Sequence, residues 1–447
     1  LAEVPGTEEY LYELAAMYQY AGKPAEAITV YNRAEKFFGV NETSSTQKQR
    51  IFWEMNKMEE AIAEGEKLVN TFPDEERYAV GFAEFLSQNK EMEKAVAVLE
   101  KFIHENSSAP NASMLLAGVY RDLNQEEKAR QLLLSIFDNS EVEYNSKLIV
   151  LSTYNAELNQ AKAKQTADSS KENFAIELFT RLASQFPNEV NTHILGGDLY
   201  LSLSKNTEAE RHYLKAIELG EVNFEVWQNL LYLQVQREAF DAVIDNSEKA
   251  LEYYPNQSML YYFNGMAHVR QKRYKAASAS LEQGKKLAAS NPGMTSELNA
   301  MLGEAYNGTR EYEKSDKAFD EALAFNANNA IVLNNYSYYL ALRKASLDKA
   351  EKMSALLIKN NPDNATFLDT YAWVLYTREK YKEARKIMER AVATGKANAT
   401  HIEHYGDILF KLNEVDLAVE QWEKAKGMLN ASNENLNKKI ANRKIYE

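Results

Sequence analysis

The chain has 447 residues, of which 45% are hydrophobic and 26% charged, so it can bury a substantial core and is not a largely disordered polypeptide. Its formal net charge of −13 argues against a surface built to bind nucleic acid, because the overall field opposes such binding. The absence of cysteine excludes disulfides, thiolate metal sites and cysteine nucleophiles.

Low glycine and proline contents, 17 and 8 residues, favour an all-helical class. No run of about 18 apolar residues appears, so the sequence predicts no membrane-spanning segment. The chain starts at Leu1 without an initiator methionine, and we expect it to continue upstream, where any export signal or lipid anchor would lie.

A block of alternating large and small residues begins near the N-terminus, in ELAAMYQYAGKPAEAITVYNRA (13–34). The clearest copies are DTYAWVLYTREKYKEARKIMERA (369–391) and HYGDILFKLNEVDLAVEQWEKA (404–425), in which equivalent positions lie 34 residues apart. Each small residue of one copy is matched by a small one in the other, and each large residue by a large one. Copies at opposite ends of the chain predict a repeat array between them.

Each block reads as two amphipathic helices joined by a short polar turn. The second helix carries alanine, a large residue and alanine at successive offsets of four and three, which is the spacing of one helix face, as in Ala384, Met388 and Ala391. Small residues let two helix axes approach, and large ones fill the space beside them. The alternation is therefore a packing rule between neighbouring hairpins.

These positions resemble the tetratricopeptide repeat family, a 34-residue helix-turn-helix unit. The resemblance implies an all-α fold, a right-handed α-solenoid of about twelve repeats with a C-terminal capping helix. The small positions of the twelve second helices are Ala27, Ala61, Ala95, Ala129, Ala175, Ala209, Val243, Ala277, Ser315, Ala350, Ala384 and Ala418. Prolines where the family ends its second helix support this frame: Pro73, Pro187, Pro255 and Pro362.

The frame divides the chain into five segments. They are an N-terminal tail (1–7), an array of about four repeats (8–143), an irregular repeat (144–187), an array of about seven repeats (188–428) and a capping helix (429–447). In the irregular repeat the step from Ala129 to Ala175 is 46 residues, so a polar segment near 159–173 is inserted. This insertion is either a longer first helix plus a loop or a flexible excursion.

The second repeat and the C-terminal helix differ from the regular pattern. The second repeat has Gln49 where glycine or alanine is expected, and Gly65 where a ring belongs. In the capping helix, Leu436, Ile440 and Ile445 are expected to face inward and cover the last hairpin.

The sequence offers little chemistry. In HIEHYGD, His401, His404 and Asp407 follow each other at offsets of three and are the candidate metal ligands, but the simpler interpretation is the first helix of the last repeat. Nucleotide-binding loops and nucleophile elbows are missing, and only six histidines are present. We therefore expect no catalytic residues, no cofactor and no enzyme activity.

The resemblance implies that first helices line a concave groove in which partners bind. Carried over position by position, the candidate partner-binding residues are Tyr262, Met266, Ala300, Glu304, Asp369, Trp373, Glu403 and Asp407. This mixture is aromatic, apolar and acidic, which suits a basic or apolar peptide segment. The alternative interpretation is that Trp373 and Tyr262 only pack within the array.

The sequence thus predicts a non-enzymatic scaffold that binds a partner polypeptide along an extended surface. The alternative is a structural or assembly subunit of a larger complex, held through its ends or its convex face. The unit NNYSYYLALRKASLDKAEKM (334–353) and the tail KKIANRKIYE resemble those of bacterial cell-envelope lipoproteins with such repeats. The resemblance favours a periplasmic or outer-membrane-anchored location, with a cytoplasmic one as the alternative.

Overall fold

The computed structural model describes residues 8–106, 109–166, 168–429, 431 and 433–446. These residues form 25 α-helices and one short 3-10 helix, Glu8–Tyr10, and contain no strand. None of these helices combines the length and the apolar run needed to cross a bilayer. The predicted tail, residues 1–7, lies outside the described residues.

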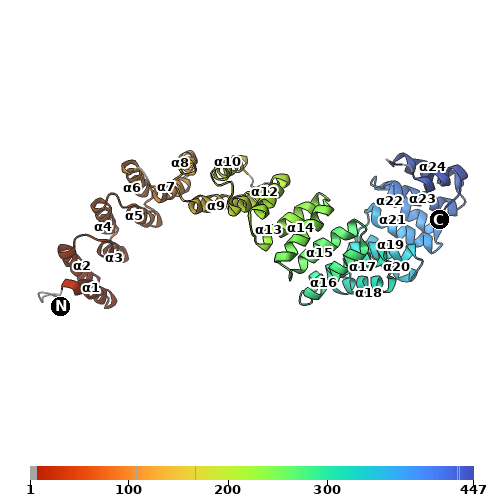
Figure 1. Ribbon diagram of the computed structural model, residues 1–447, viewed down its shortest axis with the longest axis horizontal. Coiled ribbons are helices and arrows are strands. Elements are labelled where there is room, and N and C mark those ends of the chain that lie inside the picture. Colours follow the sequence, from red (N-terminus) through yellow and green to blue (C-terminus); the bar gives the residue numbers. More distant parts are fainter. Residues whose placement is uncertain (1–7, 107–108, 167, 430, 432, 447) are drawn as a thin grey trace. The chain divides into compact units, whose positions relative to one another are not determined.

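The helices form two compact units, the first ending at Glu221 and the second beginning at Val222 (Figure 1). The helices of unit 1 are α1 Leu11–Tyr20, α2 Pro24–Phe38, α3 Glu42–Glu54, α4 Met58–Thr71, α5 Glu76–Gln88, α6 Met92–Glu105, α7 Pro110–Asp122, α8 Glu126–Asp138, α9 Tyr144–Ala163, α10 Ser169–Gln185, α11 Val190–Ser202 and α12 Asn206–Leu219. Each odd-numbered helix pairs with the next even-numbered one, so unit 1 contains six hairpins.

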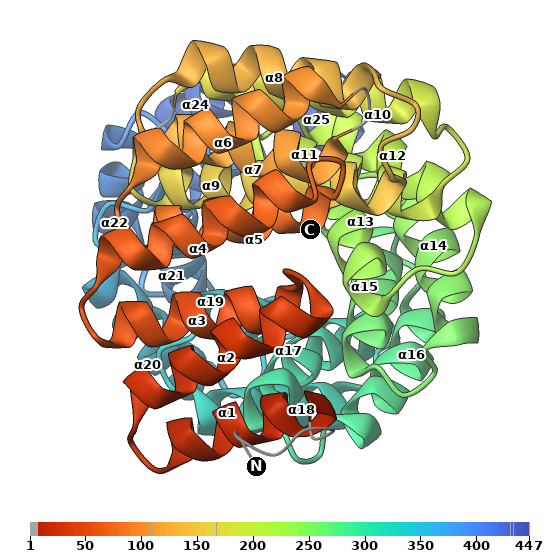
Figure 2. The ribbon, with the colours of Figure 1, turned by 90° about the vertical axis from the view of Figure 1, so that its left-hand side faces the viewer.

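Unit 2 contains six further hairpins and one additional helix. Its helices are α13 Phe224–Gln236, α14 Phe240–Tyr253, α15 Ser258–Arg270, α16 Tyr274–Leu287, α17 Pro292–Gly308, α18 Tyr312–Phe325, α19 Ala330–Leu342, α20 Leu347–Asn360, α21 Ala365–Thr377, α22 Tyr381–Ala393, α23 Ala399–Lys411, α24 Val415–Gly427 and α25 Glu434–Asn442. Within this unit, the odd-numbered helices from α13 to α21 lie on the inner side of the curve. Their even-numbered partners lie on the outer side (Figure 2). The predicted all-α solenoid is confirmed.

The predicted packing rule explains why the hairpins stack. All twelve small positions of the second helices are at most 1% exposed. At Gly406 a Cβ would lie 2.5 Å from the ring of Trp422, and at Gly303 it would lie 2.6 Å from Phe319. The ring of the second helix therefore sits directly against the small residue of the first.

The exception in the second repeat has the same physical origin. Gly65 replaces the expected ring, and a Cβ there would lie 2.2 Å from Phe82 of the next hairpin. Phe82 is 4% exposed, so a ring from the neighbouring repeat occupies the space that the second repeat leaves open.

Turns and helix ends follow a common plan. Each hairpin has one residue with a φ between 52° and 70° in its turn: Gly22, Asn56, Lys90, Asn124, Gln165, Ser204, Glu238, Lys272, Arg310, Lys344, Glu379 and Asn413. This left-handed conformation reverses the chain within a few residues. The predicted prolines each lie two residues beyond a second helix, as Pro73 does after α4 and Pro362 after α20.

The inserted segment mostly lengthens helices. The first helix of the irregular repeat, α9, has 20 residues and continues to Ala163, and α10 has 17 and begins at Ser169. Of the predicted segment 159–173, only residue 167 lies outside the described part. The longer first helix, one of the two alternatives from the sequence, is therefore what the structure shows.

Candidate partner-binding surface

The predicted partner-binding residues lie on four odd-numbered helices of unit 2. Tyr262 and Met266 belong to α15, Ala300 and Glu304 to α17, Asp369 and Trp373 to α21, and Glu403 and Asp407 to α23. Most are more buried than a free binding surface would be, and the exposed fractions of Met266, Glu304, Asp369 and Asp407 are 4–7%. Only Tyr262, Trp373 and Glu403 are half-buried.

The acidic residues of this set bind neighbouring repeats. Asn335 of α19 donates a hydrogen bond to Glu304 of α17 at 2.8 Å. Nδ1 of His404 on α23 lies 2.9 Å from Oδ1 of Asp369 on α21. Since both contacts join successive first helices, these carboxylates hold the array together.

Two further contacts complete this row, which we call the inter-repeat ladder. Thr370 of α21 donates to Asn334 of α19 at 2.8 Å. Lys439 of α25 donates to Glu403 at 2.8 Å and to both oxygens of Asp407 at 2.9 and 2.8 Å. The ladder thus links α17, α19, α21, α23 and α25 through buried or half-buried polar groups, and hydrogen bonding offsets the cost of burying them.

Electrostatics follow from this burial. Burial raises the pKa of Glu304, although Arg270 and the hydrogen bond from Asn335 oppose the shift. Burial alone would lower the pKa of His404, but the charge and hydrogen bond of Asp369 outweigh it and the pKa is raised. His404 and Asp369 therefore form a buried ion pair when the imidazole is protonated.

Half-buried aromatic residues lie beside the ladder. Trp373 stacks on Tyr376, with ring centroids 4.7 Å apart, and on His404 at 4.0 Å. Tyr262 contacts Phe263 edge to face at 5.9 Å, and Tyr338 of α19 is also half-buried. We call Tyr262, Tyr338, Trp373 and Tyr376 the aromatic row.

Sequence reasoning missed two members of this row. Tyr376 lies three residues after Trp373, which places it on the same helix face, and this offset could have identified it. Tyr338 stands in the repeat with one extra turn residue, NNYSYYLALRKAS, where the exact register was harder to assign.

The three candidate metal ligands do not converge. His401 accepts a hydrogen bond from the backbone N–H of Asn398, His404 pairs with Asp369, and Asp407 binds Lys439. Steps of three residues turn the side chain by about 60° each, so the first and last members point about 120° apart. Within the described ranges, no group of three His, Asp or Glu side chains is placed to hold a metal ion.

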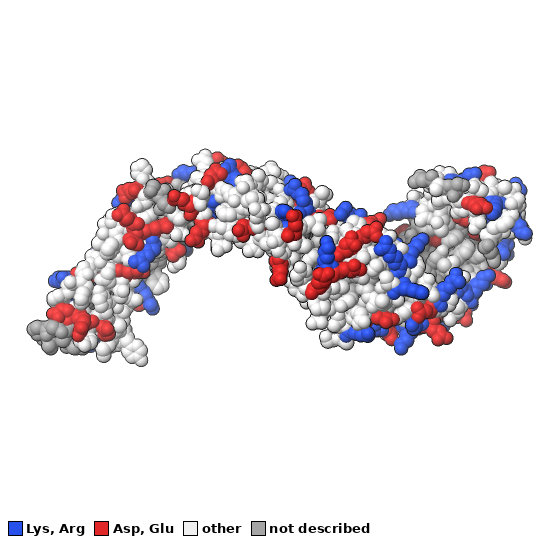
Figure 3. All heavy atoms as spheres, viewed as in Figure 1, with Lys and Arg blue, Asp and Glu red and all other residues white. Residues whose placement is uncertain are grey.

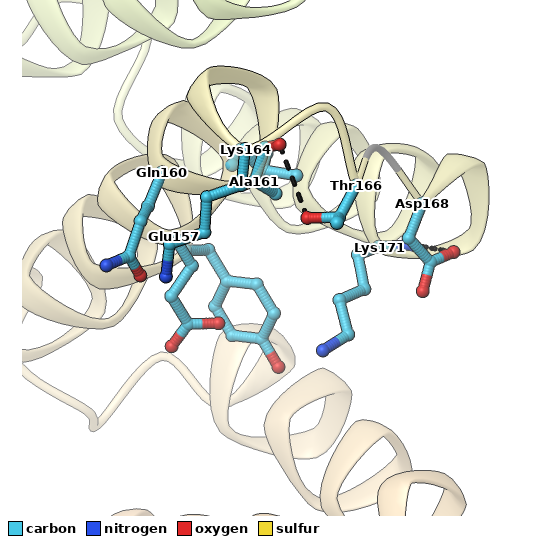
Figure 4. Close-up of a pocket in the computed structure, with 9 residues that line it drawn as sticks. Glu157, Gln160, Ala161, Lys164, Thr166, Asp168 and Lys171 are labelled. Atoms are coloured by element: carbon cyan, nitrogen blue, oxygen red, sulfur yellow. Dashed lines mark hydrogen bonds between the residues drawn. The ribbon is translucent and has the colours of Figure 1, made fainter.

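A cavity of about 320 Å³ lies beside the irregular repeat, at the end of α9. Figure 4 shows Glu157 of α9, Lys164 directly after α9 and Lys171 of α10 around it. Its carboxylates already have partners, because Arg121 donates to both oxygens of Glu157 and Asp168 caps α10. The cavity arises where the insertion extends α9 beyond the usual length of a first helix.

The surface charge is mixed. On the face drawn in Figure 3, Lys and Arg side chains lie beside Asp and Glu side chains over both units. Many of these are ion pairs between successive repeats, such as Arg385 with Glu414 at 2.6 Å and Lys285 with Glu321 at 2.6 Å. Such exposed pairs contribute little to stability individually.

Comparison with known proteins agrees with the repeat assignment. Models of the tetratricopeptide repeat match residues 296–329 and 370–426. A 97-residue segment is 30% identical to the human protein named Protein O-mannosyl-transferase TMTC3, and covers 22% of this chain. The chain spans only 11% of that human protein.

Three solved structures matched by this chain are the following. A tetratricopeptide repeat protein from Parabacteroides merdae has a TM-score of 0.47 at 16% identity, covering 57% of this chain and 98% of its own. Cut9 in its complex with Hcn1 has a TM-score of 0.42 at 11% identity, covering 98% and 90%. Yeast Tom70 has a TM-score of 0.38 at 16% identity, covering 98% and 94%.

Proposed function

Because the chain contains tetratricopeptide repeats, we propose that it is a non-enzymatic scaffold that binds a partner polypeptide along the first helices of unit 2. The observation that carries this proposal is the aromatic row. Tyr262, Tyr338, Trp373 and Tyr376 lie on three first helices and keep part of their ring surface exposed. Partly exposed aromatic rings are the side chains that contribute most to polypeptide interfaces.

The position of the row beside the inter-repeat ladder supports a defined partner chemistry. Glu304 and Asp369 are occupied by Asn335 and His404, so they are not free to form new ion pairs. They still place negative charge next to the rings, which favours a segment with apolar and basic side chains. The acidic residues predicted to contact a partner therefore act through the field they create.

A second candidate function is a structural subunit held through exposed apolar surface. Unit 1 exposes large apolar side chains on its first three helices: Met17 (65%), Tyr20 (97%), Phe37 (54%), Phe38 (50%) and Trp53 (48%). Several large apolar groups on neighbouring elements are typical of an interaction surface. In this alternative, unit 1 provides the contact and the aromatic row only packs.

Loss of partner binding on changing the aromatic row tests the proposal. We expect a partner captured by the full chain, identified and then purified, to bind the Tyr262→Ala and Trp373→Ala double variant at least about tenfold more weakly, as hot-spot aromatic residues do. Tyr253→Ala with Phe325→Ala is the matched control, since both rings are exposed on the outer helices α14 and α18.

Circular dichroism should show equal helicity for both double variants, so that lost binding is not lost folding. A partner that binds the two variants equally well would exclude the aromatic row. If binding is instead lost when Tyr20 and Met17 are changed to alanine, the structural-subunit alternative replaces it.

A further inference from the structure

The last helix of the described chain, α25, packs on the final hairpin as a first helix of another repeat would. Leu436 is 1% exposed and joins the core of Ile402, Leu409 and Trp422, with Ile440 and Ile445 partly buried beside it. The inward positions predicted for the capping helix are therefore confirmed.

Lys439 places its ammonium group in an acidic site on α23. Its Nζ lies 2.8 Å from Glu403 and 2.8 Å from Asp407, and its side chain is 6% exposed. Trp422 donates its indole N–H to Asp407 at 3.0 Å, and Lys439 lies 6.0 Å from the centre of that ring. Glu403 and Asp407 are four residues apart on one helix, where like charges repel, so the pair requires a cation.

On α23, the position that corresponds to Lys439 of α25 is occupied by His404, which belongs to a complete hairpin. His404 on α23 and Lys439 on α25 are both the sixth residue after a capping asparagine, Asn398 and Asn433. His404 donates to α21 in the way that Lys439 donates to α23. The acidic site of the last repeat is thus a position for a cationic side chain on an incoming helix.

The present occupant is held by few groups. α25 has nine residues, and an isolated helix of this length is unstable in water. Leu436, Lys439 and Ile440 attach it, together with Ile445 and the ion pair of Arg443 with Asp416 of α24 after its end, whereas α23 is packed between α21, α22 and α24. Elements with few buried contacts open at low free energy while the rest of the array stays folded.

From this geometry we infer that the surface formed by α23 and α24 is a docking site for a basic amphipathic helix of a partner polypeptide, and that α25 is its resident intramolecular competitor. The partner helix carries an apolar residue, a lysine three positions later and an apolar residue directly after it. Leu436, Lys439 and Ile440 provide the template for this pattern. Apolar anchors and one buried charge pair together give such a site selectivity.

The inference rests on the proposed function only in taking a polypeptide as partner. It involves neither Tyr262 nor Trp373, so the two proposals can fail separately. A failure of the aromatic-row experiment leaves the site on α23 untouched, and the reverse also holds.

Hydrogen exchange of the full-length native protein tests whether α25 opens on its own. Amides of α25 should exchange at least about 100-fold faster than those of α23, because local opening of α25 costs less free energy than opening the array. Equal protection of α25 and α23 would overturn its role as a displaceable competitor. This measurement needs no variant and is insensitive to folding defects.

A labelled peptide with the sequence of residues 433–446 tests the docking site directly. We expect it to bind the full-length Leu436→Ala and Lys439→Ala double variant at least about tenfold more tightly than the wild-type chain, in which α25 competes. Lys438→Ala is the matched control, since Lys438 is exposed and pairs with Glu434 of its own helix. This control protein should bind the peptide like the wild type.

Changes in the probe define what is recognised. The peptide with Lys439→Ala should lose at least about tenfold in affinity, whereas the peptide with Lys438→Ala should not. A designed helix that keeps only the leucine, lysine and isoleucine at this spacing should also bind the double variant.

Three results would overturn the proposal: equal peptide binding by the wild type and the double variant, equal binding of the Lys439→Ala peptide, or no binding of the designed helix. Dimerisation of the wild-type chain by exchange of α25, measured by light scattering, would assign the site to a second copy and overturn the partner assignment.

Discussion

The irregular repeat of unit 1 and the last repeat of unit 2 both bury a lysine, but in different surroundings. Lys147 of α9 donates to the backbone carbonyls of Phe137 and Asn139 at 3.1 and 2.7 Å and to the side chain of Gln185 at 2.6 Å. Lys439 of α25 donates instead to two carboxylates. One lysine thus meets neutral oxygens at the end of a helix, and the other meets an acid pair.

The difference teaches how to distinguish a structural charge from an exchangeable one. The carbonyls bound by Lys147 belong to the C-terminal end of α8 and the residue after it, where a cation is favourable. Gln185 also donates to the carbonyl of Phe137, so Lys147 is part of a buried network that joins α8, α9 and α10. The carboxylates bound by Lys439 would regain water if α25 left. Removal of Lys147 should therefore damage the fold, whereas removal of Lys439 should release one helix.

The largest effect is expected for Lys147→Met. The substitution removes three hydrogen bonds made by a buried cation, so unit 1 should lose about 2–4 kcal/mol of unfolding free energy. Urea unfolding of the full chain, with hydrogen exchange to locate the loss in α8 to α10, measures it. Lys164→Met is the control, because Lys164 is exposed directly after the end of the same helix, and should change stability by less than about 0.5 kcal/mol.

The difference in stability between the wild type and Lys147→Met should depend on pH. Burial lowers the pKa of the Lys147 amine in the folded state below its usual 10.5, although the charge of Asp138 opposes the shift. The unfolded chain then binds more protons between the two pKa values, so stability rises with pH in that interval. The advantage of the wild type over Lys147→Met should therefore grow with pH in the interval below 10.5, and a constant difference would contradict this assignment.

A smaller effect is expected for Gly406→Ala in the last repeat. The new Cβ would lie 2.5 Å from Trp422 and 3.0 Å from the backbone oxygen of Ala418, so unit 2 should lose about 1–3 kcal/mol through overpacking. Gly427→Ala is the control, because a Cβ there meets nothing within 4 Å in the last residue of α24. Hydrogen exchange can show which helices lose protection in Gly406→Ala. If only α25 loses protection, then α23 and α24 tolerate the added Cβ and the overpacking argument is wrong.

The parts of the fold that could be predicted are those that repeat. Ala384 and Ala418 were identified because the same packing contact recurs about every 34 residues, and both are fully buried. The first helices of the array were also predicted, and Tyr262 and Trp373 lie on two of them, α15 and α21.

The contacts made by the polar residues on that face could not be predicted. Helical periodicity assigns Asp369 and Glu403 to a face but says nothing of the distance to the next first helix. Only the structure shows that His404 and Lys439 reach these carboxylates across successive repeats. The sequence therefore did not indicate that these predicted binding residues already have partners in neighbouring repeats, and it did not single out Tyr338 and Tyr376.

The smallest expected effect concerns the turns of the same two repeats. Gln165 in the irregular repeat and Asn413 in the last one both adopt a left-handed conformation, with φ of 58° and 64°. This conformation strains glutamine, whereas asparagine tolerates it because its short side chain can hydrogen-bond locally. Gln165→Gly should therefore stabilise unit 1 by up to about 1 kcal/mol, and Asn413→Gly should leave unit 2 within about 0.5 kcal/mol.

Thermal unfolding of the two variants beside the wild type measures this contrast. Glycine relieves the strain at Gln165 but also increases the entropy of the unfolded chain, which limits the gain. Equal changes in both variants would mean that turn strain is the same in the irregular repeat and the regular one. A gain at Gln165 alone would show that this turn position strains glutamine more than asparagine, and the same strain is then expected at Lys90, Glu238 and Arg310 of the regular repeats.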